Sequence, residues 1–265
     1  MTTIPVQDVA PFLEYRVINA NSLQWLYENY TGNEQYDCIF ADPPDGIGLG
    51  YNEFNDKTPD REYRDFLHDC LREFVRHSPI VWFSFNAKWT AAFGYIADQF
   101  LQTTRGKDWE MKPCVQTFTF GQHRNTDLGN NHRPLWRFKH RDALLYPHHV
   151  KVPSWRQLNG DPRAKEGGRV PGDVFDFPRV TGNSKQRRRW HPTQLNEGLV
   201  DRAISLSTCV GDKVLDPFAG TGTTLRVCKQ IGRACTVIDM DTKYCRKIAE
   251  ENSVPKVEEN LMPVS

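Results

Sequence analysis

A short segment in the last quarter of the chain, residues 216–224, has the composition of a ligand-binding turn. It reads Asp-Pro-Phe-Ala-Gly-Thr-Gly-Thr-Thr and follows the apolar pair Val214-Leu215. Two glycines one residue apart let the backbone turn sharply and leave no side chain between it and a ligand. A helix that begins after them presents unpaired backbone N–H groups to a carboxylate or hydroxyl. The candidate binding residues of this segment are Asp216, Phe218, Gly220, Gly222 and Thr223.

An acid follows the glycines at the spacing of a nucleoside site. Residues 234–238 are predicted to form a strand, and Asp239 ends it about twenty residues after the glycines. In a strand–turn–helix–strand unit, an acid at this position reaches the ribose hydroxyls of a bound nucleoside. A Gly-x-Gly pair alone is a weak signal, whereas the complete unit predicts a nucleoside cofactor.

Residues 36–45, Tyr-Asp-Cys-Ile-Phe-Ala-Asp-Pro-Pro-Asp, form a second candidate site. An apolar strand runs into Asp42, and Pro43 and Pro44 then make a stiff, extended turn because each proline fixes φ and removes an N–H donor. The carbonyls and the carboxylate form a pocket of acceptors. Such a pocket suits an amino group, which donates two hydrogen bonds while its lone pair faces an electrophile. Pro-Pro alone is typical of an ordinary strand-ending turn, but the glycine unit favours a catalytic role.

Together with His191-Pro192-Thr193-Gln194, these two segments resemble the S-adenosylmethionine-dependent DNA amino-methyltransferases. The catalytic segment precedes the cofactor segment, which is the order of the family's permuted beta group. The resemblance covers roughly residues 15–100 and 190–250. It implies transfer of a methyl group from S-adenosylmethionine to the exocyclic amine of adenine (N6) or cytosine (N4) in DNA, as in restriction–modification systems.

The resemblance also implies a role for each matching residue. Asp42 and the Pro43 carbonyl would hold the target amine, and Pro44 and Asp45 complete the catalytic motif. An aspartate at the first position favours adenine, because the family's cytosine enzymes more often carry serine there. The cofactor contacts implied are Asn21 (adenine), Thr193 (methionine carboxylate), Phe218 with the backbone of 220–223 (methionine end) and Asp239 (ribose).

Asp45 departs from the family pattern, in which an aromatic residue stacks on the flipped-out base. A carboxylate cannot stack, and burying it unpaired beside Asp42 would be costly. Three interpretations remain open. An aromatic elsewhere stacks on the base while Asp45 reads a base edge, the target base is unusual or not flipped in the common way, or the chain is a catalytically impaired DNA-binding relative. The aromatic candidates are Tyr51, Trp82 and Phe85. An RNA methyltransferase is a further alternative, but it gives no reason for the Asp-Pro-Pro turn in this permuted order.

Strands that alternate with helices predict an α/β fold with a doubly wound, mostly parallel, Rossmann-like sheet. Ser22 is predicted to cap a short helix and Pro59 to open a longer one. If the strands at 38–40 and 214–215 are neighbours, the Asp42 and Gly220 turns face one crevice. The stretch 121–189 shows little periodicity and predicts long recognition loops. We therefore divide the chain into a catalytic half (1–104), a target-recognition segment (105–189) and a cofactor-binding half (190–265).

The net charge of this 265-residue chain is only +1, so contact with nucleic acid must come from local clusters of basic residues. One cluster contains Arg133 and Arg137, and the other contains Arg187, Arg188 and Arg189 just before His191. Phosphate neutralisation needs such local density. A solvated charged loop explains the first cluster equally well.

Composition excludes several other classes of protein. None of the seven cysteines is spaced as Cys-x-x-Cys, which indicates reduced thiols and neither disulfides nor a zinc site. His140, His148 and His149 lack further ligands in metal-binding spacing, so we expect no metal. No run of eighteen apolar residues is present, and we expect a soluble, cytoplasmic protein that acts on double-stranded DNA. The resemblance leaves open a homodimer and a cognate restriction nuclease.

Overall fold

The computed structural model describes residues 13–33, 35–50, 56–118 and 125–259. Within these ranges one sheet has the strand order β6-β4-β5-β3-β2-β7-β8-β1-β9. The strands are β1 (Tyr15–Asn19), β2 (Cys38–Ala41), β3 (Ile80–Ser84), β4 (Trp109–Thr117), β5 (His132–His140), β6 (Val174–Asp176), β7 (Lys213–Asp216), β8 (Ala234–Asp239) and β9 (Val257–Glu259). Every described pairing is parallel except those of β5 with β3 and β4. The prediction of a mostly parallel α/β sheet is confirmed.

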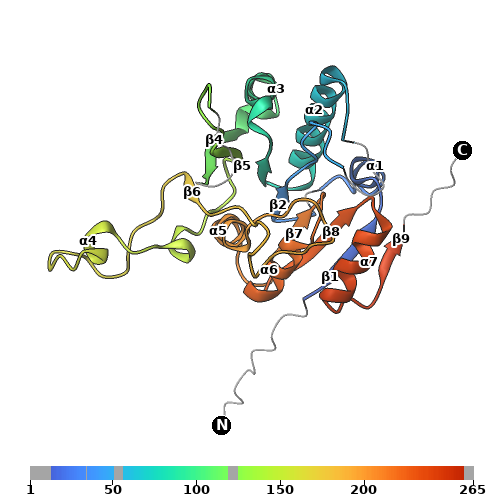
Figure 1. Ribbon diagram of the computed structural model, residues 1–265. Helices are drawn as coiled ribbons and strands as arrows, with labels where there is room; N and C mark the ends of the chain where they lie inside the picture. The colour runs from blue at the N-terminus through green and yellow to red at the C-terminus, as the bar shows by residue number, and fades with distance from the viewer. Residues whose placement is uncertain (1–12, 34, 51–55, 119–124, 260–265) are drawn as a thin grey trace, which may run out of the picture.

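Helices cover both faces of the sheet (Figure 1). On one face lie α1 (Ser22–Glu28), α2 (Asp60–His77) and α3 (Thr90–Gln102), and on the other lie α5 (Glu197–Ser207), α6 (Thr223–Ile231) and α7 (Thr242–Glu251). The apolar side chains of a β-strand alternate between the two faces. Ile39 therefore joins the α1–α3 core, and Phe40 joins the α5–α7 core. Short connecting turns are η1 (Ala87–Trp89), η2 (Gly106–Asp108) and η3 (Pro147–Val150).

The boundary residues of α1 and α2 show how local chemistry sets helix starts. Asn21, and not Ser22, caps α1, since its side chain accepts from the backbone N–H of Gln24 at 3.2 Å. The hydroxyl of Ser22 instead donates to the carbonyl of Pro217, which ties α1 to the turn after β7. Pro59 precedes α2 as predicted.

The strand β5 was not expected, because its sequence lacks a clear alternation of apolar and polar residues. One face carries Pro134, Trp136 and Phe138, but the other mixes Leu135 with arginine and lysine. The Lys139 ammonium is satisfied within the fold, since it donates to three backbone carbonyls. Long-range hydrogen bonding thus overrides a weak sequence pattern.

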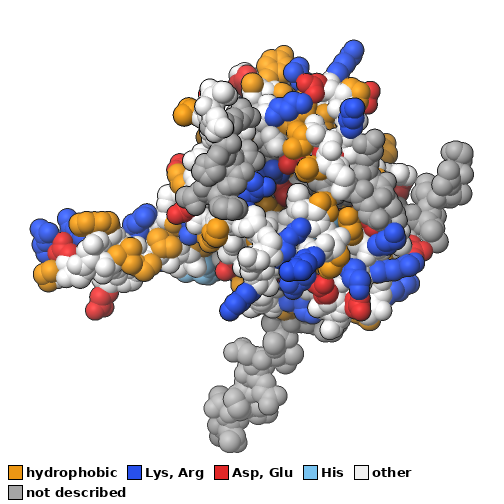
Figure 2. Space-filling view, in the orientation of Figure 1, with side chains coloured by type: hydrophobic (Ala, Val, Ile, Leu, Met, Phe, Trp, Pro, Cys, Tyr) orange, Lys and Arg blue, Asp and Glu red, His pale blue; other side chains and the backbone are white. Residues whose placement is uncertain are grey.

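Part of the chain between β5 and α5 projects from the body of the molecule as an arm (Figure 1). This arm contains the short helix α4 (Trp155–Leu158). An antiparallel bridge between Val152 and Arg169 closes the base of this arm. The arm carries hydrophobic and basic side chains on its surface (Figure 2). Trp155 is 71% exposed and Leu158 is 72% exposed, so this part of the chain buries little of its own apolar surface.

Candidate functional site

The Asp-Pro-Pro-Asp turn leaves the sheet at the carboxyl end of β2, and two aromatic residues hold it. The Tyr63 hydroxyl donates to the Pro44 carbonyl, and the Trp89 indole N–H donates to the Asp45 carbonyl at 2.7 Å. Among the described residues, none donates a hydrogen bond to the Pro43 carbonyl. The turn therefore has a fixed backbone, with one carbonyl and the Asp42 carboxylate available as acceptors.

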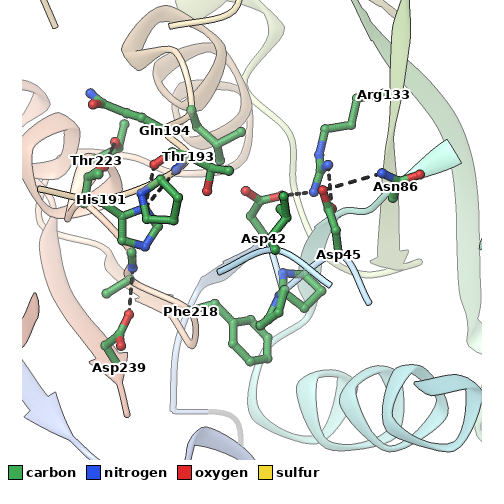
Figure 3. Close-up of a pocket in the computed structure, with 18 of the residues that line it drawn as sticks. Asp42, Asp45, Asn86, Arg133, His191, Thr193, Gln194, Phe218, Thr223 and Asp239 are labelled. Carbon is green, nitrogen blue, oxygen red and sulfur yellow. Dashed lines mark hydrogen bonds and ion pairs between the residues drawn. The ribbon is translucent and has the colours of Figure 1, made fainter. Parts of the chain in front are cut away.

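A single arginine joins the two carboxylates of this turn (Figure 3). Arg133 Nη2 lies 2.6 Å from Asp42 Oδ1, and Arg133 Nη1 lies 2.7 Å from Asp45 Oδ1. Arg133 Nε donates to the Ser84 hydroxyl at 2.7 Å. Burial would lower the pKa of Arg133, but the two carboxylates outweigh it and raise that pKa above its usual value. The guanidinium therefore stays charged, and Asp45 is not an unpaired buried charge.

The position of Arg133 follows from the antiparallel strand. Because β5 runs against β3, its N-terminal residues lie at the edge where the parallel strands end. Leu135 pairs with Ser84, and Arg133 lies two residues further along the same face. The sequence predicts that Arg133 contacts phosphate; instead it is bound to the carboxylates of Asp42 and Asp45.

The glycine loop connects β7 to α6 and uses both glycines in left-handed backbone conformations. Gly220 has φ +52° and Gly222 has φ +70°. A Cβ on Gly222 would lie 2.8 Å from Ile248, so this glycine packs against α7 and does not line the cavity. A Cβ on Gly220 would lie 3.4 Å from His191, on the cavity side. The loop therefore needs glycine at 222 to pack against α7 and glycine at 220 to leave open space in the cavity.

Two carboxylates accept hydrogen bonds from the backbone N–H groups of this loop. Asp216 accepts the backbone N–H of Phe218 at 2.9 Å, and burial raises the pKa of Asp216 to about 7. Asp239 accepts the N–H groups of Gly220 and Asp241, each at 2.9 Å. A carboxylate oxygen has two acceptor sites, so a carboxylate can accept from backbone N–H groups and from ligand hydroxyls together.

The segment with His191 forms the opposite wall of the cavity. His191 Nδ1 lies 2.6 Å from the Thr193 carbonyl, and its ring packs against Tyr244 at 4.6 Å between centroids. Burial lowers the pKa of His191 to about 4, so the ring is neutral at pH 7. Thr193 lines the cavity. The Thr223 hydroxyl also lies at the cavity and is bonded to the Thr221 hydroxyl at 2.9 Å.

The basic run before His191 serves mainly to hold this wall in place. Arg187 Nη2 donates to the carbonyl of His191 at 2.7 Å, and Arg188 Nε lies 2.7 Å from Glu251. Only Arg189 of the three is exposed. The sequence predicts three phosphate contacts here. Of the three arginines, Arg189 alone has an exposed side chain that could make one.

Arg137 is half-buried and does not line the cavity. Its guanidinium is 5.9 Å from the centre of the Trp82 ring, and burial lowers the pKa of Arg137. Its Nε is buried without a hydrogen-bond partner. A phosphate contact of Arg137 therefore lies outside the cavity and stays a prediction.

The candidate stacking aromatics are also constrained. Trp82 is 1% exposed, with its indole N–H donated to Ser207 at 2.8 Å, and Phe85 is fully buried. Neither can stack on a base, so both predictions were wrong. Tyr51 lies outside the described residues. Aromatic side chains that do line the cavity are Tyr63, Phe66, Phe118, Phe218 and Tyr244.

The two turns open into one cavity of about 1090 Å³. Pairing of β2 with β7 brings them together, since Ile39 lies opposite Leu215, as the single-crevice prediction requires. In Figure 3, Asp42 and Asp45 face Thr193, His191 and Asp239 across the cavity, with Phe218 below. Figure 2 shows a hollow on this face of the molecule, with basic and acidic side chains inside it. Predicted site residues on its lining are Asn21, Asp42, Pro43, Pro44, Asp45, Arg133, Arg187, Thr193, Asp216, Phe218, Gly220, Thr223 and Asp239.

The lining residues fit a nucleoside cofactor carrying an amino acid. Asp239 offers acceptors for ribose hydroxyls, Phe218 offers an apolar face, and the space above Gly220 is one that a side chain would fill. Single small-molecule pockets are typically ~300–1,000 Å³. This cavity therefore has room for the cofactor and for part of a second ligand.

Several residues that build the site carried no sequence signal. Tyr63 and Trp89 fix the turn, and Ser84 fixes Arg133. The 1% exposed Asp56 accepts backbone N–H groups from Gly46, Ile47 and Leu49 and shapes the loop after the turn. Tyr63, Trp89 and Ser84 act on segments distant from them in sequence, so no local motif marks them.

Comparison with known proteins gives consistent results. A family model described as DNA methylase matches residues 36–251. The chain is 29% identical over 246 residues to the type II methyltransferase M.HpaI of Haemophilus parainfluenzae, covering 90% of this chain and 74% of that protein. It is 28% identical over 235 residues to the DNA adenine methyltransferase YhdJ of Escherichia coli, covering 80% of this chain and 74% of that protein.

Solved structures share the fold at low sequence identity. The complex of M1.HpyAVI with S-adenosylmethionine matches with a TM-score of 0.60 and 18% identity, over 89% of this chain and 98% of that one. The cytosine-N4-specific PvuII DNA methyltransferase matches with a TM-score of 0.63 and 14% identity, over 89% of each chain. In the described part of this chain, no helix has the length and apolar character needed to cross a membrane.

Proposed function

The chain belongs to the DNA methylase family and is an S-adenosylmethionine-dependent methyltransferase of DNA amino groups, and we propose that its target is N6 of adenine in double-stranded DNA. One observation supports transfer to an amino group. The Asp42 turn and the Gly220 loop, which follow neighbouring parallel strands, line the same cavity. An amine held by the first turn would therefore lie beside a cofactor held by the second.

The chemistry that we propose for the chain is mainly positioning. Asp42 Oδ2 and the Pro43 carbonyl accept the two N–H bonds of the amine, which directs its lone pair at the methyl group. S-adenosylmethionine, when bound, supplies that methyl group from its sulfonium, and the rest of the cofactor leaves as a neutral thioether. The proton shed by the amine passes to the Asp42 carboxylate. The base must leave the helical stack to reach this depth.

We assign the cofactor contacts to the other side of the cavity. Asp239 would hold the ribose hydroxyls, Asn21 at the start of α1 the adenine, and Phe218 the methionine end. Thr193 would approach the methionine carboxylate. Support comes from the strand order, since β8 lies between β7 and β1 and brings their three carboxyl ends together.

The preference for adenine rests on the aspartate at the first position of the motif, where serine is more usual in the family's cytosine enzymes. Mapping the product decides it. Nucleosides from DNA methylated in vitro should contain N6-methyladenine, and N4-methylcytosine alone would overturn the preference.

We propose that DNA recognition lies in the segment 105–189, mostly in the part after β5. The strands β4 and β5 extend the central sheet, whereas the arm around α4 projects from the body with exposed Trp155 and Leu158. A homodimer and a cognate restriction nuclease are further proposals that follow from the resemblance. The seven free thiols suit a reducing, cytoplasmic setting.

Replacing Asp42 with alanine tests the function directly. We expect Asp42→Ala to abolish transfer of labelled methyl groups to unmethylated duplex DNA, while calorimetry shows cofactor binding retained. The 82% exposed Asp142 gives a matched control, because Asp142→Ala removes a carboxylate far from the cavity. Near-normal turnover of Asp42→Ala would refute the assignment. Methyl transfer to RNA and not to DNA in a parallel assay would identify an RNA methyltransferase. A wild-type protein that binds DNA but transfers no methyl group would be a catalytically impaired relative.

A further inference from the structure

The guanidinium of Arg133 is shared between two carboxylates in an unusual way. An arginine facing one carboxylate tends to form a fork, with two nitrogens bonded to the two oxygens of the same group. Here one nitrogen bonds Asp42 Oδ1 and the other bonds Asp45 Oδ1, while Nε is held by Ser84. The fork is split, and among the described residues no hydrogen bond occupies Asp42 Oδ2.

The split leaves the catalytic carboxylate half bound and half available. Oδ1 is fixed by a charged hydrogen bond, so the carboxylate plane cannot rotate freely. Oδ2 remains able to accept a proton donor from the cavity. Without Asp45, the same guanidinium would be free to close its fork on Asp42 and occupy both oxygens. The side chains are largely buried, at 19% exposure for Arg133, 24% for Asp42 and 14% for Asp45, so water competes weakly for these bonds.

We propose that Arg133 is a positioning residue that orients Asp42 for the target amine, and that Asp45 keeps Arg133 from capping Asp42. Asp45 then acts through Arg133 and neither stacks on the base nor reads its edge. The inference rests on the proposed role of Asp42. It explains why a carboxylate stands where the family usually has an aromatic residue, since an aromatic there would leave the buried arginine with Asp42 as its only counterion.

A double-mutant cycle tests this coupling. Single-turnover methyl transfer at saturating DNA and cofactor is measured for Asp45→Asn, Arg133→Gln and the double variant. Asp45→Asn should slow transfer roughly a hundredfold, the scale for misplacing a catalytic group, while the dissociation constants for cofactor and DNA stay unchanged. In the Arg133→Gln background, the same Asp45→Asn change should slow transfer no further, because no arginine remains to cap Asp42.

Multiplicative losses in the double variant would overturn the proposal, because they mean that Asp45 acts on the substrate itself. A wild-type rate for Asp45→Asn would overturn it as well. If Arg133→Gln does not fold, Arg133→Lys keeps the test, since a single ammonium nitrogen does not reproduce the three separate nitrogens with which Arg133 contacts Asp42, Asp45 and Ser84. Transfer by Arg133→Lys should then fall, and Asp45→Asn should add little to that loss.

A control variant separates loss of this coupling from loss of a strand-linking ion pair. Arg16 forms a comparable pair with Glu258 at 2.7 Å, between β1 and β9 at the far end of the sheet. Arg16→Gln should leave the single-turnover rate unchanged. An inactive wild-type enzyme refutes the proposed function and this inference together, whereas an active wild type with multiplicative losses refutes the inference alone.

Discussion

Replacing Asp216 with asparagine should make the protein more stable at neutral and alkaline pH. Asp216 is 5% exposed at the end of β7. Burial raises its pKa from 3.8 to about 7, and the charges of Asp42 and Asp239 add to this rise. Between these pKa values the folded protein keeps a proton that the unfolded chain has lost. Stability therefore falls as pH rises through this window, and the loss persists above it.

The size of the effect follows from the two pKa values. Each unit of pKa difference corresponds to about 1.4 kcal/mol, so ionised Asp216 lowers the free energy of unfolding by about 4 kcal/mol at pH 8. Asparagine has nearly the same shape, can still accept the Phe218 N–H, and has no charge to desolvate. The difference in unfolding free energy between variant and wild type should grow by about 3 kcal/mol from pH 5 to pH 8.

Urea unfolding at several pH values measures this difference. His191, whose burial lowers its pKa to about 4, titrates with the opposite sign, but it is present in both proteins and cancels in the comparison. Asp142→Asn, at an 82% exposed position, should show no growing difference. A difference between Asp216→Asn and wild type that is constant from pH 5 to pH 8 would refute the reasoning.

Three further predictions concern the loop, the cofactor and the DNA. Gly222→Ala should lower the unfolding free energy by roughly 1–3 kcal/mol, because the new Cβ meets Ile248 and the φ of this residue is left-handed. Gly182→Ala is the control, because a Cβ at Gly182 meets open space. Equal melting temperatures for Gly222→Ala and wild type would contradict the prediction. Asp239→Ala should weaken cofactor binding by about 2 kcal/mol, close to thirtyfold, and unchanged affinity by calorimetry would refute the ribose contact. Arg189→Gln should lower the slope of log DNA affinity against log salt by about one, whereas a variant of Arg188, which is paired with Glu251, should change it little. Equal slopes for wild type and Arg189→Gln would show that Arg189 does not touch phosphate.

The sequence by itself determined the two turns and their order. A strand that ends in Asp42 and two prolines, and a strand that ends in a glycine loop, are specified by neighbouring residues. Proline and glycine act on the backbone within one or two positions. The acid at Asp239 belongs to the same local unit, and it does bond to the Gly220 N–H. The parallel sheet that joins the two turns followed from the alternation of strands and helices.

Only the tertiary structure decided what the charged residues near these turns do. Arg133 is separated from Asp42 by 91 positions and reaches it because β5 is antiparallel, a strand that its own sequence did not reveal. Arg188 reaches Glu251 over 63 positions, and Trp82 is buried by residues far from it in sequence, Phe175 and Ser207. The partner of a charged side chain is set by which strands and helices lie together, and charge type and local spacing do not encode that arrangement.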